Sequence, residues 1–575
     1  MNSWLVITNK NLNMKQNLES LSNNKVIIKD NLKLYYKLDG RFLKDQIFCE
    51  NQNYLIVIDG VILNLSELMK KYNTNNLKMT VIEMYKKNGE EFLNELRGPF
   101  SGFFYDSVKN QAISFSNQTG DAPIFSYEDD NIWLVGSDFN YIVGFLKENS
   151  INYKFNKTAA KYMLTFGYMI DDSTFIKEIK RITAGKYLIN DGNKLTEKTY
   201  HMFKNKSIYV SFDEAIELID NAFRKAIKRC FEKDLEYGYE YHLVDMSAGL
   251  DSRMTNWIAK DMGYNKIFNI SYSQLNSDEH KISGLVSSAL NNQLIHKKLD
   301  DVSFIYEIDE IIKYNYGLAL FCGITGGKQL LESLNYNKFG LEHTGQLGDV
   351  IIGTFSKIVK NEKPNINSYR YSELLSINFE NKIVEKYDNQ ELYNLYSRGF
   401  LGALSTHITR RNYTYIVSPF LDVDFLSICL SIPLKYRVNH KLYWAWIDKK
   451  YPNAGKIPST RKRQNVDLYG KVKYLHSRVV KKVQRELLRA LSKLQIVNHA
   501  SSPNDMNPFE YWYDTDSNLR NFISEYYDMN ITKLNDYAEI KKYVEEMYFS
   551  KNIMDKMMAL SVIGAVKAYF GEGYE

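Results

Sequence analysis

The segment YEYHLVDMSAGLDSRMTNWIAKDMG, residues 239–263, decides the fold expected for this chain. It contains an apolar strand, a tight turn with a glycine, and an amphipathic helix that starts in the turn. A second strand, KIFNISYS (266–273), and a second helix, SDEHKISGLVSSAL (277–290), follow at once. Strands that alternate with helices predict a parallel sheet covered by helices. We therefore expect an α/β domain in the middle of the chain.

The regions on either side of this segment differ in the secondary structure that they predict. SFDEAIELIDNAFRKAIKRCF (211–231) is an amphipathic helix with Ser211 at its N-cap, and helices dominate again from about residue 370. Residues 1 to about 200 read as short strands and turns, for example YLIVIDGVIL (54–63). The predicted fold class is an α+β N-terminal sandwich, then an α/β parallel-sheet domain, then a helical C-terminal region. The expected divisions are 1–204, 205–470 and 471–575.

The composition excludes several classes of protein. Of 575 residues, 44% are hydrophobic and 25% are charged, which is typical of globular proteins and not of disordered ones. A net charge of +6 is too small to indicate nucleic-acid binding. No apolar run approaches the ~18–20 residues of a membrane span. We expect a cytoplasmic protein that binds no nucleic acid.

The cysteines and histidines give no metal motif. The four cysteines lie far apart without a CxxC pair, which excludes a zinc knuckle and a dense disulfide framework. His242, His296, His343 and His407 are isolated in the sequence, without HxxxH or HExxH spacing. We therefore expect no zinc site.

The turn Ser247-Ala-Gly-Leu-Asp-Ser252 carries the strongest functional signal. Gly249 allows a ligand to approach the backbone, and the amides at the start of a helix can bind a phosphate chain. Ser247 and Ser252 add hydroxyl donors. Asp251 does not favour a bare phosphate, so it indicates a bridging Mg²⁺. The alternative is a Ser/Asp turn that only caps the helix.

A second glycine-rich turn occurs in LEHTGQLGDVIIGTF (341–355). Gly345, Gly348 and Gly353 surround Asp349, an acid that an apolar strand does not need. If this turn lies beside the first, Asp251 and Asp349 can share one cation. The alternative is an ordinary glycine turn with a surface acid.

These motifs, taken with others in the right order, resemble the asparagine synthetase family. The resemblance covers roughly residues 50–465. In the second half it includes SPFLDVDFLSICLSIP (418–433), and in the first half LIVIDGVILNLSEL (55–68), GPFSGFFYD (98–106) and TGDAPIFSY (119–127). The resemblance implies an Ntn-hydrolase-like glutamine-amidotransferase domain followed by an ATP-pyrophosphatase synthetase domain.

The resemblance also implies a reaction. ATP would activate a carboxylate as an acyl-adenylate with release of pyrophosphate, and an amine would then displace AMP, with ATP and Mg²⁺ as cofactors. Asp251 and Asp349 would hold Mg²⁺. A cation near a proline would stabilise charge on the phosphates; in IPSTRKR (457–463) this is Lys462 or Arg463, unless the run is a solvated basic loop. The ATP-binding residues would be Leu243, Val244, Ser247, Gly249, Asp251, Ser252, Ile270, Ser271 and Gly345.

The first half departs from the family at the glutaminase site. The family's glutaminase uses a cysteine at the mature N-terminus, whereas this chain begins Met1-Asn2-Ser3. The family's Asn-Gly-Glu loop reads Asp59-Gly60-Val61, and an expected acid is absent from Lys78-Met79-Thr80. We therefore predict a domain that keeps its fold but does not hydrolyse glutamine. The chain resembles family branches without this cysteine, which form β-lactams, cyclise lasso peptides or amidate sugar acids.

The second half departs as well. Ala248 replaces a glycine of the loop, Gln346 replaces an acid, and Val350 replaces the acid after Asp349. The two metal acids remain, so ATP chemistry is expected. The acceptor pocket is predicted to differ from that of ordinary aspartate amidation.

Residues 471–494 predict a basic amphipathic helix with eight basic residues against one acid, Glu486. One reading is a helix packed on the synthetase domain with a solvated basic face. The other is peripheral contact with a membrane surface, or contact with an anionic substrate or peptide.

Four more residues have two readings each. Asp422 caps the following helix or acts in catalysis. Arg398, Arg410 and Arg411 bind a substrate carboxylate or form surface ion pairs.

The leading functional hypothesis is an amide-forming ligase that acts on a small-molecule or peptide carboxylate. Its amine is ammonia, ammonia from a separate glutaminase, or a substrate amine. The alternatives are a glutamine-hydrolysing asparagine synthase, a non-catalytic scaffold relative, and a tRNA-modifying enzyme with the same loop. The sequence leaves the oligomeric state open, a dimer included.

Overall fold

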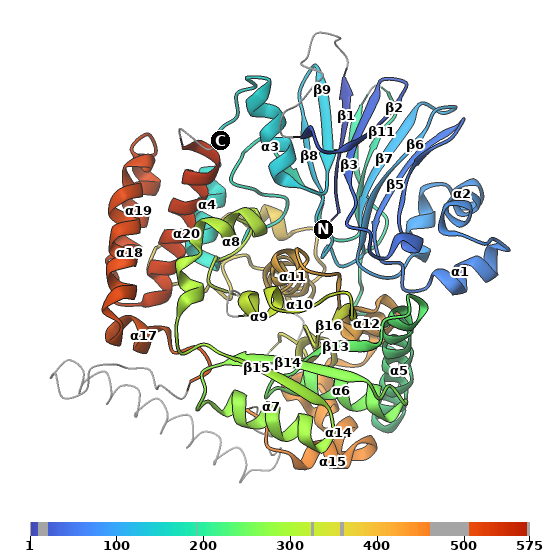
Figure 1. Cartoon of the computed structure of the whole chain (residues 1–575), viewed down its shortest axis with the longest axis vertical. Coiled ribbons are helices and arrows are strands. Elements are labelled where there is room, and N and C mark those ends of the chain that lie inside the picture. The colour runs from blue at the N-terminus through green and yellow to red at the C-terminus, as the bar shows by residue number, and fades with distance from the viewer. Residues whose placement is uncertain are drawn as a thin grey trace.

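The computed structural model of this protein describes residues 2–9, 21–192, 194–323, 327–356, 362–460 and 505–571. Figure 1 shows two strand-rich layers beside one another at the N-terminal end, a third sheet below them, and helices around all three. The basic segment 471–494, Lys462 and Arg463 lie outside the described residues. None of the described helices combines the length and apolar character needed to cross a bilayer.

The N-terminal part, residues 2–204, contains two six-stranded antiparallel sheets. The first has the order β10-β8-β9-β1-β3-β2 and the second β12-β11-β7-β6-β5-β4. Their strands are β1 (Ser3–Asn9), β2 (Lys25–Lys29), β3 (Leu32–Lys37), β4 (Ile47–Glu50), β5 (Tyr54–Gly60), β6 (Phe100–Asp106), β7 (Gln111–Ser116), β8 (Phe125–Glu128), β9 (Ile132–Gly136), β10 (Lys180–Arg181), β11 (Lys186–Asn190) and β12 (Leu195–Thr199).

The two sheets pack face to face. Trp4 and Val6 of β1 share one buried cluster with Val57 of β5 and Phe103 of β6. The alternation of inward and outward side chains along each strand produces this core. Helices α1 (Leu65–Tyr72) and α2 (Leu77–Asn88) cover the outer face of the second sheet. The predicted strand-rich sandwich with helices over it is confirmed.

The third sheet is parallel, with the order β15-β14-β13-β16-β17. Its strands are β13 (Tyr241–Asp245), β14 (Ile267–Ser273), β15 (Gln293–Lys298), β16 (Phe339–His343) and β17 (Ile416–Val417). The helices after β13 and β14 are α6 (Leu250–Asp261) and α7 (Asp278–Ala289), as the sequence predicts. The long helix α5 (Phe212–Glu236) precedes β13, and Ser211 and Glu214 form a capping box at its start.

The remaining helices complete the shell. They are α3 (Phe139–Glu148), α4 (Lys157–Phe166), α8 (Ile308–Asn315), α9 (Lys328–Glu332), α10 (Gln390–Asn394), α11 (Ser405–Arg410), α12 (Val423–Ser431), α13 (Leu434–Arg437), α14 (Lys441–Lys450), α15 (Pro452–Lys456), α17 (Phe509–Thr515), α18 (Ser517–Asn530), α19 (Ala538–Tyr548) and α20 (Ile553–Phe570). Two π-helices, η6 (Asp349–Gly353) and η8 (Leu395–Ala403), lie near the third sheet.

The C-terminal helices do not form a core of their own. Buried side chains of α20, such as Met558 and Ile563, belong to the cluster that also holds Leu5 of β1 and Ile142 of α3. Figure 1 shows α20 beside α4 and α8, between the N-terminal sheets and the outer helices α18 and α19. The first and last described segments of the chain are therefore packed together.

Candidate active site

A cavity of about 520 Å³ opens at the carboxyl ends of β13 and β16. In open parallel sheets this edge is where ligands bind. The turn after β13 supplies Ser247, Gly249, Asp251 and Ser252 to its wall, and the turn after β16 supplies residues 344–347, 349 and 350. The two sequence motifs, about 100 residues apart, therefore line one cavity.

Two glycines allow the turns to touch. A Cβ at Gly345 would lie 2.3 Å from the amide nitrogen of Ser252, and one at Gly348 would lie 2.8 Å from the carboxyl carbon of Asp251. Gly249 differs, because its φ is −71° and a Cβ there would meet only the Ser247 hydroxyl, at 3.2 Å. Gly345 and Gly348 are thus required by contact between the turns, whereas backbone conformation does not require Gly249.

The predicted phosphate turn is held by its own serines. The Ser252 hydroxyl accepts a hydrogen bond from the Ser247 amide at 3.0 Å and lies 2.8 Å from the Ser247 hydroxyl. The Ser247 hydroxyl accepts from the Gly249 amide at 3.2 Å. Glu279 of α7 accepts from the Ala248 amide at 2.9 Å. These bonds fix the turn at the start of α6, where backbone amides and the helix dipole favour an anion.

Asp251 and Asp349 lie side by side in the cavity wall. The Asp349 amide donates to Asp251 Oδ2 at 2.9 Å, and the Tyr443 hydroxyl of α14 donates to Asp251 Oδ1 at 3.0 Å. A carboxylate oxygen that accepts one hydrogen bond can also ligate a cation. Two carboxylates beside a phosphate-binding turn are the donor set that Mg²⁺ takes in nucleotide sites, so these residues fit the ion.

Four of the predicted ATP-binding residues lie in the strands and not in the cavity wall. Leu243 and Val244 of β13 and Ile270 and Ser271 of β14 are buried and do not line it. The Ile270 carbonyl already accepts from the Met246 amide at 2.8 Å. From β14 it is Tyr272 that reaches the cavity.

Sequence reasoning missed an acid in this wall. Asp245, at the end of β13, pairs with Arg410 through two bonds of 2.9 and 2.8 Å. Arg410 also contacts the buried carboxylate of Glu342. Burial raises the pKa of Asp245, and Arg410 opposes that shift. Arg410 is thus neither a surface ion pair nor an unpaired substrate anchor.

Arg398 has a different environment. It lines the cavity from η8, and its guanidinium lies over the rings of Phe355 and Tyr369, 5.5 and 5.8 Å from their centres. It is exposed, and no ion pair joins it to another described residue. Of the three arginines weighed, it is the one placed to meet an anionic ligand.

The chain after α15 runs along the same site. Arg253 of α6 donates to the carbonyls of Ile457 and Pro458 at 2.8 and 2.5 Å. The Ser459 hydroxyl donates to the Ala248 carbonyl at 3.3 Å. The segment that leads toward Lys462 and Arg463 is therefore fixed against the phosphate turn.

The histidines are not isolated in space. Asp234 Oδ2 of α5 lies 2.7 Å from a ring nitrogen of His242 and 2.7 Å from one of His343. Burial alone would raise the pKa of Asp234, but His343 and His242 lower it below its usual value. These three groups lie within 4.8 Å of one another, so the spacing argument overlooked a cluster. Separations of 2.7 Å are those of charge-assisted hydrogen bonds, which tie α5 to β13 and β16.

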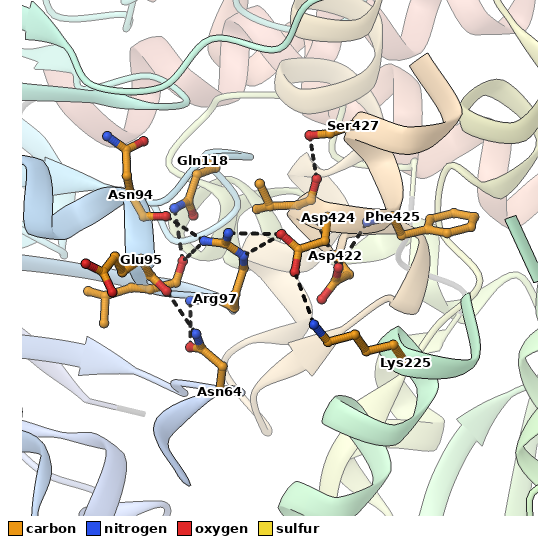
Figure 2. Close-up of polar contacts among 12 residues, drawn as sticks. Asn64, Asn94, Glu95, Arg97, Gln118, Lys225, Asp422, Asp424, Phe425 and Ser427 are labelled. Atoms are coloured by element: carbon orange, nitrogen blue, oxygen red, sulfur yellow. Dashed lines mark hydrogen bonds and ion pairs between the residues drawn. The ribbon is translucent and has the colours of Figure 1, made fainter. Parts of the chain in front are cut away.

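Asp422 caps a helix, as one of its two readings predicts. Its Oδ1 accepts from the amides of Asp424 and Phe425 at 3.0 and 3.1 Å (Figure 2). Figure 2 also shows Arg97 of the N-terminal part reaching Asp424 of α12, at 3.0 Å. This ion pair joins the two halves of the chain.

Asp59, at the predicted glutamine loop, is completely buried and faces the second half of the chain. Its Oδ2 accepts from Arg411 at 2.8 Å, and its Oδ1 accepts from the Tyr415 hydroxyl at 2.8 Å and from Asn2 at 3.2 Å. Ser3 begins β1, and its hydroxyl donates to the Tyr141 hydroxyl at 2.9 Å. All four cysteines have free thiols, and none is at the start of the chain.

Comparisons with known proteins agree with these observations. A sequence profile described as "Glutamine amidotransferase domain" matches residues 43–201. A putative asparagine synthetase (glutamine-hydrolyzing) 1 of Methanocaldococcus jannaschii is 22% identical over 70% of this chain and 68% of its own length. An asparagine synthetase (glutamine-hydrolyzing) 2 of Bacillus subtilis is 21% identical over 44% of this chain and 36% of its own length.

A solved structure titled as the allosteric regulatory enzyme of purine biosynthesis covers 52% of this chain and 58% of its own, with 11% identity and a TM-score of 0.23, too low to support an argument. The sequence relatives and the amidotransferase profile together support the resemblance to the asparagine synthetase family that the motifs indicate.

Proposed function

We propose that this protein is an ATP-dependent ligase that activates a carboxylate as an acyl-adenylate, releases pyrophosphate, and passes the acyl group to ammonia or a substrate amine. The observation that carries the proposal is the contact between Asp251 and Asp349 across one cavity, beside a turn of amides and hydroxyls. A carboxylate resists amines until one oxygen becomes a good leaving group, and adenylation provides that group.

The chain's own residues have distinct roles in this proposal. Ser247, Gly249 and Ser252 bind and orient the phosphates that leave. Asp251 and Asp349 would hold Mg²⁺, which neutralises charge that develops on those phosphates. Lys462 or Arg463 is proposed to add a positive charge, and the anchored segment at Ser459 supports that placement. Arg398 is proposed to orient an anionic group of the substrate.

We further propose that the N-terminal part does not hydrolyse glutamine. None of the four cysteines lies near Ser3 in the sequence, and the Ser3 hydroxyl bonds to Tyr141. The Asp59 carboxylate is occupied by three side chains of the protein itself. The amine donor is then free ammonia, a separate glutaminase or the substrate. The domain boundaries expected after residues 204 and 470 are also part of the proposal.

The test is carboxylate-dependent exchange of labelled pyrophosphate into ATP over a panel of acids. We expect exchange with at least one acid, and a loss of at least about 100-fold in Asp251→Ala. Asp424→Asn, remote from the cavity, serves as the control and should retain exchange. Steady glutamate release from glutamine would contradict the inactive N-terminal site.

A non-catalytic relative is the second candidate. The Gln346 amide, in place of a family acid, donates to the Ala403 carbonyl at 3.1 Å and so helps hold the wall together. MgATP binding without exchange for any acid would favour this candidate.

A further inference from the structure

Helix α11, only six residues long, lies between the two halves of the molecule. Figure 1 shows it between the N-terminal sheets and the third sheet. Side chains of this helix and of the next residue, Arg411, extend toward the cavity and toward the N-terminal part. On the first side, Thr406 and Arg410 form part of the wall of the cavity proposed to bind ATP, called the ATP cavity below.

On the cavity side, Arg410 neutralises buried acids. It holds Asp245 with two bonds and contacts Glu342, which is completely buried. Without this guanidinium, Asp245 would add a negative charge to a wall that already carries Asp251 and Asp349. A carboxylate in the wall of a cavity repels phosphates bound there more strongly than it would in bulk water.

On the opposite side, two acids of the N-terminal part hold the same helix. Asp59 binds Arg411 at 2.8 Å, and Asp121 lies 3.4 Å from His407. The Tyr415 ring packs under the Arg411 guanidinium, 5.3 Å from its centre. The Arg411 amide donates to the His407 carbonyl at 2.8 Å, so both contacts act on one turn of backbone.

Arg410 and Arg411 are consecutive, so a displacement of the backbone at Arg411 also displaces Arg410. A bidentate arginine–carboxylate pair tolerates little displacement, because both of its bonds depend on one plane. If Asp59 releases Arg411, the last turn of α11 gains freedom and Arg410 loses its alignment on Asp245.

We propose that Asp59 and Asp121 are positioning residues for the ATP cavity: through α11 they hold Arg410 on Asp245 and thereby maintain affinity for MgATP. This inference rests on the proposed function only in taking MgATP as the ligand. It gives the N-terminal part a role that does not involve glutamine.

The experiment measures MgATP binding to the full-length protein by titration calorimetry, without a carboxylate substrate. Asp59→Asn keeps the shape of the side chain and removes its charge. We expect the Kd to rise about fivefold to tenfold. Arg411→Lys keeps the charge but loses the planar fork, and should raise the Kd about two- to threefold.

The matched control is Asp424→Asn, which weakens the Arg97–Asp424 contact between the same two halves without touching α11 (Figure 2). Its Kd should equal that of the wild type. In an Arg410→Lys background, Asp59→Asn should raise the Kd no further, because its effect passes through Arg410. A purely structural role would instead change the Kd equally in both backgrounds.

The outcomes separate the two proposals. A wild type that binds no MgATP would overturn the proposed function and the coupling with it. A wild type that binds, with an unchanged Kd in Asp59→Asn and Arg411→Lys, would overturn the coupling alone. An equal rise of the Kd in Asp424→Asn would also overturn the coupling, because a general weakening of the contact between the halves would then explain the effect. If Asp59→Asn fails to fold, Arg411→Lys decides.

Discussion

Two pairs of acidic residues, one pair in each half of this protein, have opposite environments. In the N-terminal part, Asp59 and Asp45 are completely buried and bound to side chains from the second half, Arg411 and Lys233. In the second half, Asp251 and Asp349 border a cavity of about 520 Å³. The first pair joins the two halves of the chain, whereas the second pair lies where a ligand can enter. The comparison supports the proposal that the second half carries the ligand chemistry.

The interface acids give the largest expected effect. Lys233 and Asp45 are completely buried and 3.1 Å apart. Lys233→Met leaves the carboxylate buried without its cation, and we expect a loss of about 3–5 kcal/mol in the free energy of unfolding. Thermal unfolding checks this. Lys233→Met with Asp45→Asn should recover part of the loss, and a single variant as stable as the wild type would contradict the role given to the pair.

The cavity side is tested by Gly345→Ala. Its Cβ would lie 2.3 Å from the Ser252 amide, so the two turns must separate. A misplacement near 1 Å costs about 100-fold in rate, and we expect that loss in pyrophosphate exchange. Gly284→Ala is the control, because a Cβ there meets no atom within 4 Å. Full exchange in Gly345→Ala would show that contact between the turns does not matter.

The junction between the halves predicts a dependence on pH. Burial, and to a smaller extent Arg97, lower the pKa of His201 from 6.5 to about 4. In the unfolded chain, His201 takes up a proton near pH 6.5, whereas in the folded protein it does so only near pH 4. The free energy of unfolding therefore falls as the pH drops through this window. The contribution is about 2 kcal/mol between pH 7 and pH 5. His201→Phe should flatten that slope in denaturant unfolding; an unchanged slope would exclude His201 as its source.

The smallest effect concerns the start of α5. Ser211 accepts from the Glu214 amide, and Glu214 accepts from the Ser211 amide. Ser211→Ala removes one half of this box and should cost about 1 kcal/mol. Ser211→Thr serves as the control and should retain most of the stability. A lowered MgATP affinity in Ser211→Ala would mean that the cap also affects the cavity.

Local patterns predicted local structure well. The strand–turn–helix of residues 239–263 and the caps at Ser211 and Asp422 follow from periodicity and side-chain chemistry within a few positions. The adjacency of Asp251 and Asp349 was expected only on the condition that the two turns meet, and the structure brings these turns together at one edge of the sheet.

Contacts between distant segments could not be predicted in this way. Arg410 meets Asp245 across 165 positions, and His343 meets Asp234 across 109. No spacing rule relates such residues, because only the packed tertiary structure brings them together.

The shared core of β1, α3 and α20 has a consequence for biosynthesis. During translation the first 200 residues emerge long before α20, and until then the outer face of their first sheet lacks part of its cover. At roughly 5–20 residues per second, the ribosome needs on the order of half a minute to deliver the missing helix. Over that interval the nascent N-terminal sheets expose apolar surface of the kind that chaperones bind. The core of this part is complete only after the last helix has been synthesised.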